Sequence, residues 1–467
     1  MKTLIKNGIV VNEGLIFKAD IIIDNDSISD IVTHPYLDSD SDSGSDEQKD
    51  APHLDASLYS EIIDAGGAYV IPGIIDDQVH FREPGLTRKG DIMEGSRAAA
   101  AGGVTSFMDM PNVNPPTVSL QLLEEKQQLA AQKSAVNYSF YLGANSDNLE
   151  EIKRVNKLTT CGLKIFMGSS TGNMLVDDVS VLEAIFAESP LLIATHCEDT
   201  PTINQNLATY RAKYGDDIPP ACHPLIRSRE ACLKSSSLAA RIAHKYNSRL
   251  HILHLSTADE LPLLDKGDKG ARKTKRITGE ACIHHLWFND SAYAERGNFV
   301  KWNPAIKTEN DRQSLLKAVN DNVIDIIATD HAPHTLEDKN GLYAQVAGGG
   351  PMVQHSLIVM LELMKQGAIS LETLVDRMAH APADIFHIKG RGYLRKGYKA
   401  DICIFKEVPT DEPYIISKNN ILYKCGWSPL EGLEFSFKVQ TTFVNGKKVY
   451  ADGTFFDDVR GEMLQFE

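Results

Sequence analysis

A histidine and an arginine alternate with apolar residues in the segment 75–85, Ile-Asp-Asp-Gln-Val-His-Phe-Arg-Glu-Pro-Gly. An apolar run from Tyr69 to Ile75 precedes them and predicts a buried strand that ends in polar residues. Side chains two positions apart on a strand point the same way, so Gln78, His80 and Arg82 should share one face. An imidazole beside a guanidinium favours a metal ion next to an anionic substrate. The alternative is a surface loop with an isolated histidine.

Four more polar residues stand at or near the ends of later apolar runs, and a lysine stands inside one: Asn112, His196, His254 and Asp330, and Lys164. Each alone could be a core histidine or a helix cap. Histidines together with carboxylate-type ligands favour zinc. Lys164 is unexpected there because an ammonium repels a cation. It would fit as a carbamate, formed with carbon dioxide, that bridges two metal ions; the alternative is a buried lysine paired with Asp or Glu.

These residue types predict hydrolysis of an amide. Two metal ions can activate water at neutral pH and polarise a carbonyl group. Asp330 could take the proton from that water and pass it to a leaving nitrogen. Arg82, with Asn112 nearby, could hold a substrate carboxylate through charge-assisted hydrogen bonds.

Apolar runs alternate with amphipathic segments, such as Leu120–Lys133 and Arg229–His244, between residues 69 and 334. This alternation predicts an α/β fold with a parallel sheet, closed as a (β/α)₈ TIM-like barrel whose active site lies at the C-terminal ends of the strands. The predicted strands are Val70–His80, Thr105–Met110, Tyr138–Asn145, Gly162–Met167, Leu191–His196, Leu250–Leu255, Arg276–Cys282 and Ile324–Thr329.

Both ends of the chain contain short β-like runs instead, including a hairpin at Val439–Tyr450 with Asn445-Gly446 at its turn. We therefore expect residues 1–68 and 385–467 to form one small β-sandwich domain, and residues 69–384 to form the barrel. The acidic, low-complexity stretch 37–50 predicts a disordered surface insertion. The glycine-rich segment Gly341–Pro351 is either a mobile lid over the site or a static turn.

Composition excludes several classes of function. The net charge of −15 argues against nucleic-acid and anionic-membrane partners, which require a basic face. No apolar run reaches membrane-spanning length, and the first residues lack a signal-peptide core. The seven cysteines form no Cys-x-x-Cys pair and predict reduced thiols in a cytoplasmic protein. With these partners excluded, we expect the protein to act on a small-molecule substrate.

Taken together, the motifs resemble those of the dihydroorotases within the amidohydrolase superfamily. The resemblance covers nearly the whole chain and rests on His-Phe-Arg-Glu-Pro-Gly (80–85), Met-Pro-Asn (110–112), Thr-Asp-His-Ala-Pro-His (329–334) and the closing segment 392–401. It implies the reversible conversion of N-carbamoyl-L-aspartate to (S)-dihydroorotate, the third step of pyrimidine synthesis. The similar allantoinases and hydantoinases are the alternative, but allantoinases usually carry Asn at the position of Arg82.

The resemblance also implies one or two zinc ions per chain and a homodimer. It implies that the zinc ligands are His80, carbamylated Lys164, His196, His254 and Asp330, and that the substrate contacts are Arg82, Asn112, Asn303 and His334. One residue departs from the family pattern, which has His-x-His where this chain has Gln78-x-His80. The departure leaves Gln78 as an uncertain ligand, and it raises the alternative of a non-catalytic subunit that supports a partner such as aspartate transcarbamoylase.

Overall fold

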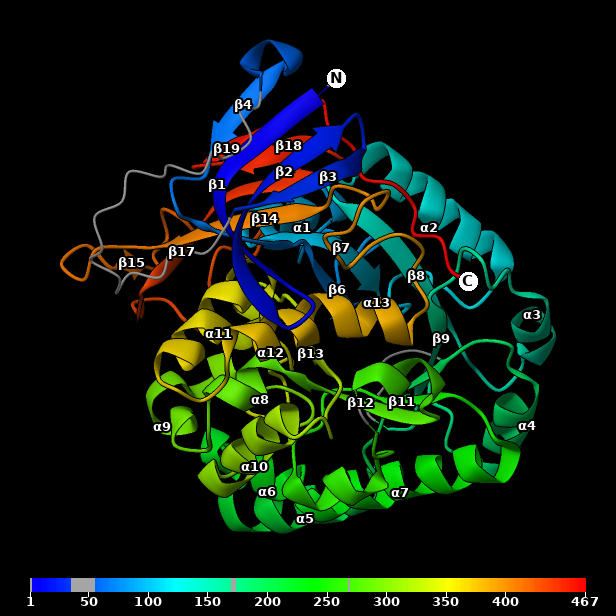
Figure 1. Cartoon of the computed structure of the whole chain (residues 1–467). Coiled ribbons are helices and arrows are strands. Elements are labelled where there is room, and N and C mark those ends of the chain that lie inside the picture. Colours follow the sequence, from blue (N-terminus) through cyan, green and yellow to red (C-terminus); the bar gives the residue numbers. More distant parts are fainter. Residues whose placement is uncertain (1, 35–54, 169–173, 268) are drawn as a thin grey trace.

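Eight parallel strands form a near-closed barrel at the centre of the molecule (Figure 1). The computed structural model describes residues 2–34, 55–168, 174–267 and 269–467, so the predicted insertion at 37–50 lies outside the described residues. Each strand pairs with the next one along the chain, and the first and last meet where His80 N–H donates to His331 O at 2.7 Å. The predicted TIM-like barrel is confirmed. Its strands are β6 (Ile74–Val79), β7 (Val104–Asp109), β8 (Asn137–Gly143), β9 (Gly162–Phe166), β10 (Ile193–His196), β11 (Leu250–Ile252), β12 (Ile277–Cys282) and β13 (Ile326–Ala328).

Helices surround the barrel (Figure 1) and bury their apolar faces against its strands. They are α1 (Ile92–Ala101), α2 (Leu120–Lys133), α3 (Leu149–Arg154), α4 (Val179–Glu188), α5 (Thr200–Tyr214), α6 (His223–Ile226), α7 (Arg229–Tyr246), α8 (Ile283–Trp287), α9 (Ala292–Arg296), α10 (Glu309–Asn320), α11 (Ser356–Lys365), α12 (Leu371–Val375) and α13 (Ala381–Ile385). Helix α2 has the predicted bounds because Ser119 caps its first turn. Helix α7 runs to Tyr246, two residues further than predicted, and Asn247 ends it in the left-handed conformation. Among the described residues, no helix combines the length and apolar composition that a membrane crossing requires.

The two ends of the chain combine in a separate nine-stranded, mainly antiparallel sheet above the barrel in Figure 1. Its strands are β1 (Lys2–Asn12), β2 (Leu15–Asp24), β3 (Ser27–Thr33), β4 (Glu61–Asp64), β5 (Tyr69–Pro72), β14 (Ile402–Glu407), β17 (Phe437–Val444), β18 (Lys447–Ala451) and β19 (Thr454–Phe455). The predicted hairpin is present, and Asn445 and Gly446 adopt the positive φ angles that its tight turn requires. A short pair, β15 (Tyr414–Ile415) and β16 (Glu434–Phe435), lies apart from this sheet.

One predicted strand is wrong. The run Val70–His80 is two strands in two sheets, because β5 pairs with β1 and β14 of the terminal sheet and only β6 enters the barrel. The break is at Gly73, where an added Cβ would lie 2.1 Å from the Thr105 hydroxyl. A continuous apolar run does not reveal such a change of sheet, since both halves are buried.

The end of the chain returns to the barrel. The backbone N–H of Tyr138, in β8, donates to Glu462 O at 3.0 Å, and Leu464 N–H donates to Tyr138 O at 2.8 Å. Leu464 and Phe466 join the apolar cluster inside the barrel with α13 and Ile75. This apolar cluster packs inside the barrel next to the polar cavity. It therefore supports the strands whose ends carry the predicted site.

Candidate active site

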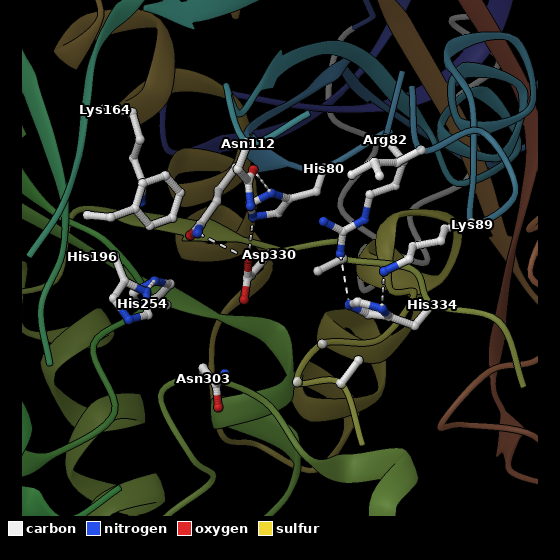
Figure 2. Close-up of a pocket in the computed structure, with 17 residues that line it drawn as sticks. His80, Arg82, Lys89, Asn112, Lys164, His196, His254, Asn303, Asp330 and His334 are labelled. Carbon is white, nitrogen blue, oxygen red and sulfur yellow. Dashed lines mark hydrogen bonds and ion pairs between the residues drawn. The ribbon is translucent and has the colours of Figure 1, made fainter. Parts of the chain in front are cut away.

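A cavity of about 290 Å³ lies at the C-terminal ends of the barrel strands (Figure 2). His196 is the last residue of β10, and Asn112, His254 and Asp330 shortly follow the ends of β7, β11 and β13. All of the residues predicted from the sequence line this one cavity: Gln78, His80, Arg82, Asn112, Lys164, His196, His254, Asn303, Asp330 and His334. The fold thus brings together residues that lie as much as 256 positions apart in the printed sequence, from 78 to 334.

His80 is held between Asn112 and Asp330. Its Nδ1 lies 2.7 Å from Asn112 Oδ1, and its Nε2 lies 3.1 Å from Asp330 Oδ1. The amide oxygen can only accept, so Nδ1 carries the hydrogen, and a ring with no hydrogen on Nε2 would turn that lone pair toward the carboxylate. Two acceptor atoms this close repel each other unless a proton or a cation lies between them. The pair therefore fits two ligands of one metal ion.

Gln78 does not present a ligand atom in this arrangement. Its Nε2 donates to Asp330 Oδ1 at 3.1 Å, and its Oε1 lies 3.7 Å from the thiol sulfur of Cys282. Burial raises the pKa of Cys282 well above its ordinary value, so the thiol remains a donor. Reversing the amide would place oxygen against the carboxylate oxygen of Asp330. Both neighbours therefore fix the amide with its NH₂ group toward Asp330.

His196 and His254 form a second group of nitrogen ligands. His196 Nε2 lies 3.0 Å from Glu198 Oε2, and its Nδ1 lies 3.0 Å from His254 Nε2. Burial would raise the pKa of Glu198, but Arg227 and His196 lower it to about 2, so Glu198 is a carboxylate that accepts from His196. Burial lowers the pKa of both histidines, which keeps them neutral as metal ligation requires.

Lys164 is buried at the same end of the cavity, with its Nζ 4.6 Å from the centre of the Phe166 ring. Burial lowers its pKa to about 8 against the opposing attraction of Asp330 and Glu280. A lower pKa raises the fraction of neutral amine, the form that reacts with carbon dioxide. These surroundings favour the predicted carbamate over a lysine that is paired directly with a carboxylate.

The opposite end of the cavity is cationic. Arg82 Nη2 lies 3.1 Å from His334 Nε2, and Lys89 Nζ lies 3.1 Å from His334 Nδ1. Arg82 also donates from Nε to Pro333 O at 3.1 Å, and it adopts a positive φ of 69°. Burial lowers the pKa of Arg82 to about 10, which leaves it charged at neutral pH. This end is suited to an anionic group, and a carboxylate would match the planar guanidinium.

The glycine-rich segment forms a wall of the cavity next to Asn303. Ala347, Gly348 and Gly349 line the cavity, and a Cβ added at Gly348 would lie 2.5 Å from Asn303 Nδ2. The wall is tied to the protein by the buried ammonium of Lys339, whose Nζ donates to Ala347 O and Gly349 O, each at 2.9 Å. In this structure the segment is anchored over the site.

Comparison with known proteins identifies the family. The model of the Amidohydrolase family matches residues 69–449. The chain belongs to the amidohydrolase family. Two similar curated proteins are named dihydroorotase. The one from Lactobacillus johnsonii is 31% identical over 461 residues, 97% of this chain and 100% of its own length. The one from Methanosphaera stadtmanae is 31% identical over 366 residues, 78% of this chain and 82% of its own length.

Solved structures of amidohydrolase-type enzymes share the fold. An L-hydantoinase (dihydropyrimidinase) from Arthrobacter aurescens superposes with a TM-score of 0.89 over 99% of both chains, at 24% sequence identity. A dihydropyrimidinase from Brevibacillus agri gives a TM-score of 0.82 over 98% of this chain and 97% of the other, at 23% identity. At this identity the likeness concerns the fold alone.

Several residues in or near the cavity of this amidohydrolase were not predicted from the sequence, among them Glu198, Phe166 and Lys89. Glu198 follows His196 by two positions, and this spacing was the available signal, since alternate residues of an extended chain share a side. Phe166 and Lys89 also line the cavity. Lys89 lies in the loop before α1, where no periodicity indicates the direction of a side chain.

A second polar cluster lies buried inside the barrel. His251 Nε2 is 3.3 Å from Asp77 Oδ2 and 3.5 Å from Glu280 Oε2, and the side chains are fully buried. The spacing of these ligand atoms would admit a metal ion. The contacts are also those of a histidine between two acidic side chains. Burial alone would lower the pKa of His251, but Asp77 and Glu280 raise it to about 9, and burial together with Asp77 raises the pKa of Glu280 to about 8. Glu280 Oε1 accepts from His254 N–H at 3.0 Å, which links this cluster to the cavity.

Proposed function

We propose that this amidohydrolase is a zinc-dependent dihydroorotase that interconverts N-carbamoyl-L-aspartate and (S)-dihydroorotate in pyrimidine synthesis. The observation that carries the proposal is that the two ends of one cavity have different residue types and charges. Metal-type ligands, including His196 and His254, occupy one end, and the Arg82–His334 pair occupies the other. Dihydroorotate has the matching form, a cyclic amide that bears a carboxylate. The relatives named dihydroorotase support the same assignment.

The residues present fit zinc. His196, His254 and carbamylated Lys164 would hold one ion, and His80, Asp330 and the same carbamate would hold a second, less completely ligated one. Zinc bound there would activate water and polarise the ring carbonyl of the substrate. The neutral state of the buried histidines and the close approach of His80 Nε2 to Asp330 Oδ1 support this ligand set.

The other side chains orient the substrate and move its proton. Arg82, His334 and Asn112 would donate hydrogen bonds to the carboxylate, and Asn303 would contact the ring. In the hydrolytic direction, Asp330 would accept a proton from the attacking water and give it to the ring nitrogen as the amide bond breaks. In the direction of ring closure it would take the proton from the ureido nitrogen. Gln78 would keep Asp330 in position through its amide N–H.

A hydantoinase reaction is the alternative within the same fold. Its substrates are neutral rings, which would leave the buried guanidinium of Arg82 without an anion at the cationic end of the cavity. A non-catalytic scaffold is the second alternative. A scaffold is disfavoured because the chain retains all of the predicted metal ligands in one cavity, and only the histidine expected at position 78 is replaced, by Gln78.

The test is an ultraviolet assay of the purified protein, loaded with zinc, against dihydroorotate, hydantoin and allantoin. We expect turnover of dihydroorotate with kcat/KM at least about a hundredfold above that for either neutral ring. A neutral ring has no carboxylate to pair with the buried guanidinium of Arg82, and a site whose buried polar group is left unpaired rejects such a substrate strongly. Arg82→Lys should abolish the preference, whereas Arg154→Lys, at an exposed arginine of α3 that pairs with Glu151, should leave it intact. Turnover of hydantoin alone would refute the proposal, and no turnover of any substrate would favour the scaffold.

Cellular context and assembly follow as further proposals. All seven cysteines lie in the described part of the chain and are buried free thiols, which favours the reducing cytoplasm. We also expect a homodimer. Light scattering should give about twice the chain mass of 51.5 kDa, and a monomer would refute this expectation.

A further inference from the structure

Lys89 contacts His334 at the cationic end of the cavity, although none of the proposed chemical steps uses it. Its Nζ lies 3.1 Å from His334 Nδ1, on the ring edge opposite the Arg82 contact (Figure 2). Its side chain is only 17% exposed, and Asp338 Oδ2 lies 3.5 Å from the same Nζ. A lysine so placed is held by the protein rather than extended into solvent.

The groups around His334 offer more hydrogen-bond donors than acceptors. A guanidinium and an ammonium have only donors, and a neutral imidazole has one donor and one acceptor nitrogen. Burial, together with Arg82 and Lys89, lowers the pKa of His334 far below its ordinary value, so the ring is neutral. Only one of the two contacts at 3.1 Å can therefore be a hydrogen bond from a cation to the ring. If Nε2 carries the hydrogen, it faces an N–H group of Arg82 with no acceptor between them; if Nδ1 carries it, the hydrogen faces the Lys89 ammonium, with Asp338 Oδ2 3.5 Å from Nδ1.

The two cations differ in their other partners. Arg82 Nε donates to Pro333 O, and the guanidinium has several further N–H groups that can turn into the cavity. Lys89 Nζ lies 3.5 Å from Asp338 Oδ2, and this carboxylate oxygen also lies 3.5 Å from His334 Nδ1. Burial and Arg82 lower the pKa of Lys89, and the Asp338 carboxylate opposes that shift. Asp338 is in turn paired with Arg88, with Oδ1 2.7 Å from Nη2. Lys89 is thus the cation with a fixed place beside Nδ1.

We propose that Lys89 is a positioning residue that donates to His334 Nδ1 and thereby holds the ring with its Nε2–H directed into the cavity beside Arg82. This inference rests on the proposed function. A substrate carboxylate would receive hydrogen bonds from Arg82 and from Nε2–H together, which relieves the opposed donors. Without Lys89 the ring is free to accept from Arg82 at Nε2. His334 Nε2 would then no longer donate a hydrogen bond into the cavity. Arg82 would already be hydrogen-bonded to the ring before the substrate binds.

The effect is specific to substrates that carry a carboxylate beside the ring nitrogen. Lys89→Met retains the length of the side chain but removes the donor. We expect kcat/KM for dihydroorotate to fall about ten- to hundredfold, the usual range for loss of a residue that orients a binding group, with most of the loss in KM. Lys89→Arg retains a donor and should recover part of it. Lys424→Met is the matched control, because Lys424 pairs with the partly buried Asp91 and makes no hydrogen bond or ion pair with His334 among the described residues.

The decisive measurement is the tautomer of His334 in the zinc-loaded, full-length protein with ¹⁵N-labelled histidine. Long-range ¹H–¹⁵N spectra distinguish a protonated Nε2 from a protonated Nδ1, and a His334→Gln variant assigns the signal. We expect Nε2–H in the parent and in Lys424→Met, and a changed tautomer population in Lys89→Met. Nδ1–H in the parent, or an unchanged signal in Lys89→Met, would overturn the inference. If the parent does not turn over dihydroorotate, the proposed function fails, but the tautomer signal still decides the role of Lys89.

Discussion

Replacement of Gln78 by histidine should convert a loosely held zinc ion into a tightly held one. In the structure both polar atoms of the Gln78 amide are in use, because Nε2 donates to Asp330 Oδ1 at 3.1 Å and Oε1 lies 3.7 Å from Cys282 Sγ. An ion held by His80 and Asp330, as proposed, would therefore gain a further ligand from Gln78 only if the amide gave up one of these contacts.

The magnitude follows from what the amide would lose by acting as a ligand. Gln78 would have to rotate its oxygen toward the metal, which breaks its hydrogen bond to the Asp330 carboxylate. A hydrogen bond to a charged group contributes about 1.5–3 kcal/mol. Since about 1.4 kcal/mol is a factor of ten, rotation weakens binding about 10- to 100-fold before the poorer affinity of zinc for a neutral oxygen is counted. Histidine supplies a nitrogen ligand without this loss.

The assay is the zinc content per chain after dialysis against a weak chelator, for the parent, Gln78→His and Gln78→Leu. We expect clearly fewer than two tightly held ions in the parent and a gain in Gln78→His. Gln78→Leu has no ligand and no donor, so it should match the parent in zinc content but turn over more slowly because Asp330 loses its partner. Two tight ions in the parent, or loss of an ion in Gln78→Leu, would show that Gln78 is a ligand and that the reasoning is wrong.

The remaining predictions concern other residues of the site and the buried cluster. Lys164→Ala should lose zinc and activity, with partial rescue by short carboxylic acids, whereas native mass spectrometry of the parent that shows no added carbon dioxide would exclude the carbamate. Asp330→Asn should fold normally but lower kcat about 10²-fold or more, and near-normal turnover would remove Asp330 from proton transfer. Arg82→Lys should lower kcat/KM for dihydroorotate because a point charge cannot replace the planar guanidinium, and an unchanged value would refute the carboxylate assignment. His251→Phe should destabilise the protein by about 3–5 kcal/mol because it leaves Asp77 and Glu280 without their cation, and an unchanged denaturation midpoint would count against the ion pairs.

The barrel and the composition of the site were predictable from the sequence because both depend on local patterns. Apolar runs alternating with helical periodicity indicated the barrel, and ligand-type residues at the ends of those runs indicated the cavity. The division of Val70–His80 between two sheets was not predictable, because it depends on pairing of β5 with β14, a strand more than 300 positions further along the sequence. A buried run looks the same whether its neighbours belong to one sheet or to two.

Contacts between side chains of different loops were also beyond the sequence. The resemblance to dihydroorotases implied that His334 would contact a substrate carboxylate, but not that Lys89 would contact the far side of its ring. The direction of the Gln78 amide is another example. It depends on Cys282, a residue of β12 whose neutral thiol no motif singles out. Such contacts are set by packing of distant segments, for which composition and periodicity carry no signal.

The hydrogen bonds of Gln78 bear on whether the site is degenerate. A ligand position that has merely lost its histidine would leave the replacement side chain without partners in the cavity, at the cost of burying a polar group. Gln78 instead lies between Cys282 and Asp330, and Cys282 Sγ is also 3.6 Å from Glu280 Oε1, whose other contact is the backbone N–H of His254. The amide therefore belongs to a buried polar chain that joins Asp330 to the segment after β11 that carries His254. If Asp330 moves the proton as proposed, this chain would position it, which a scaffold subunit would not need. Position 78 thus favours the proposed enzyme, in which an ion at His196 and His254 would be the more completely ligated one.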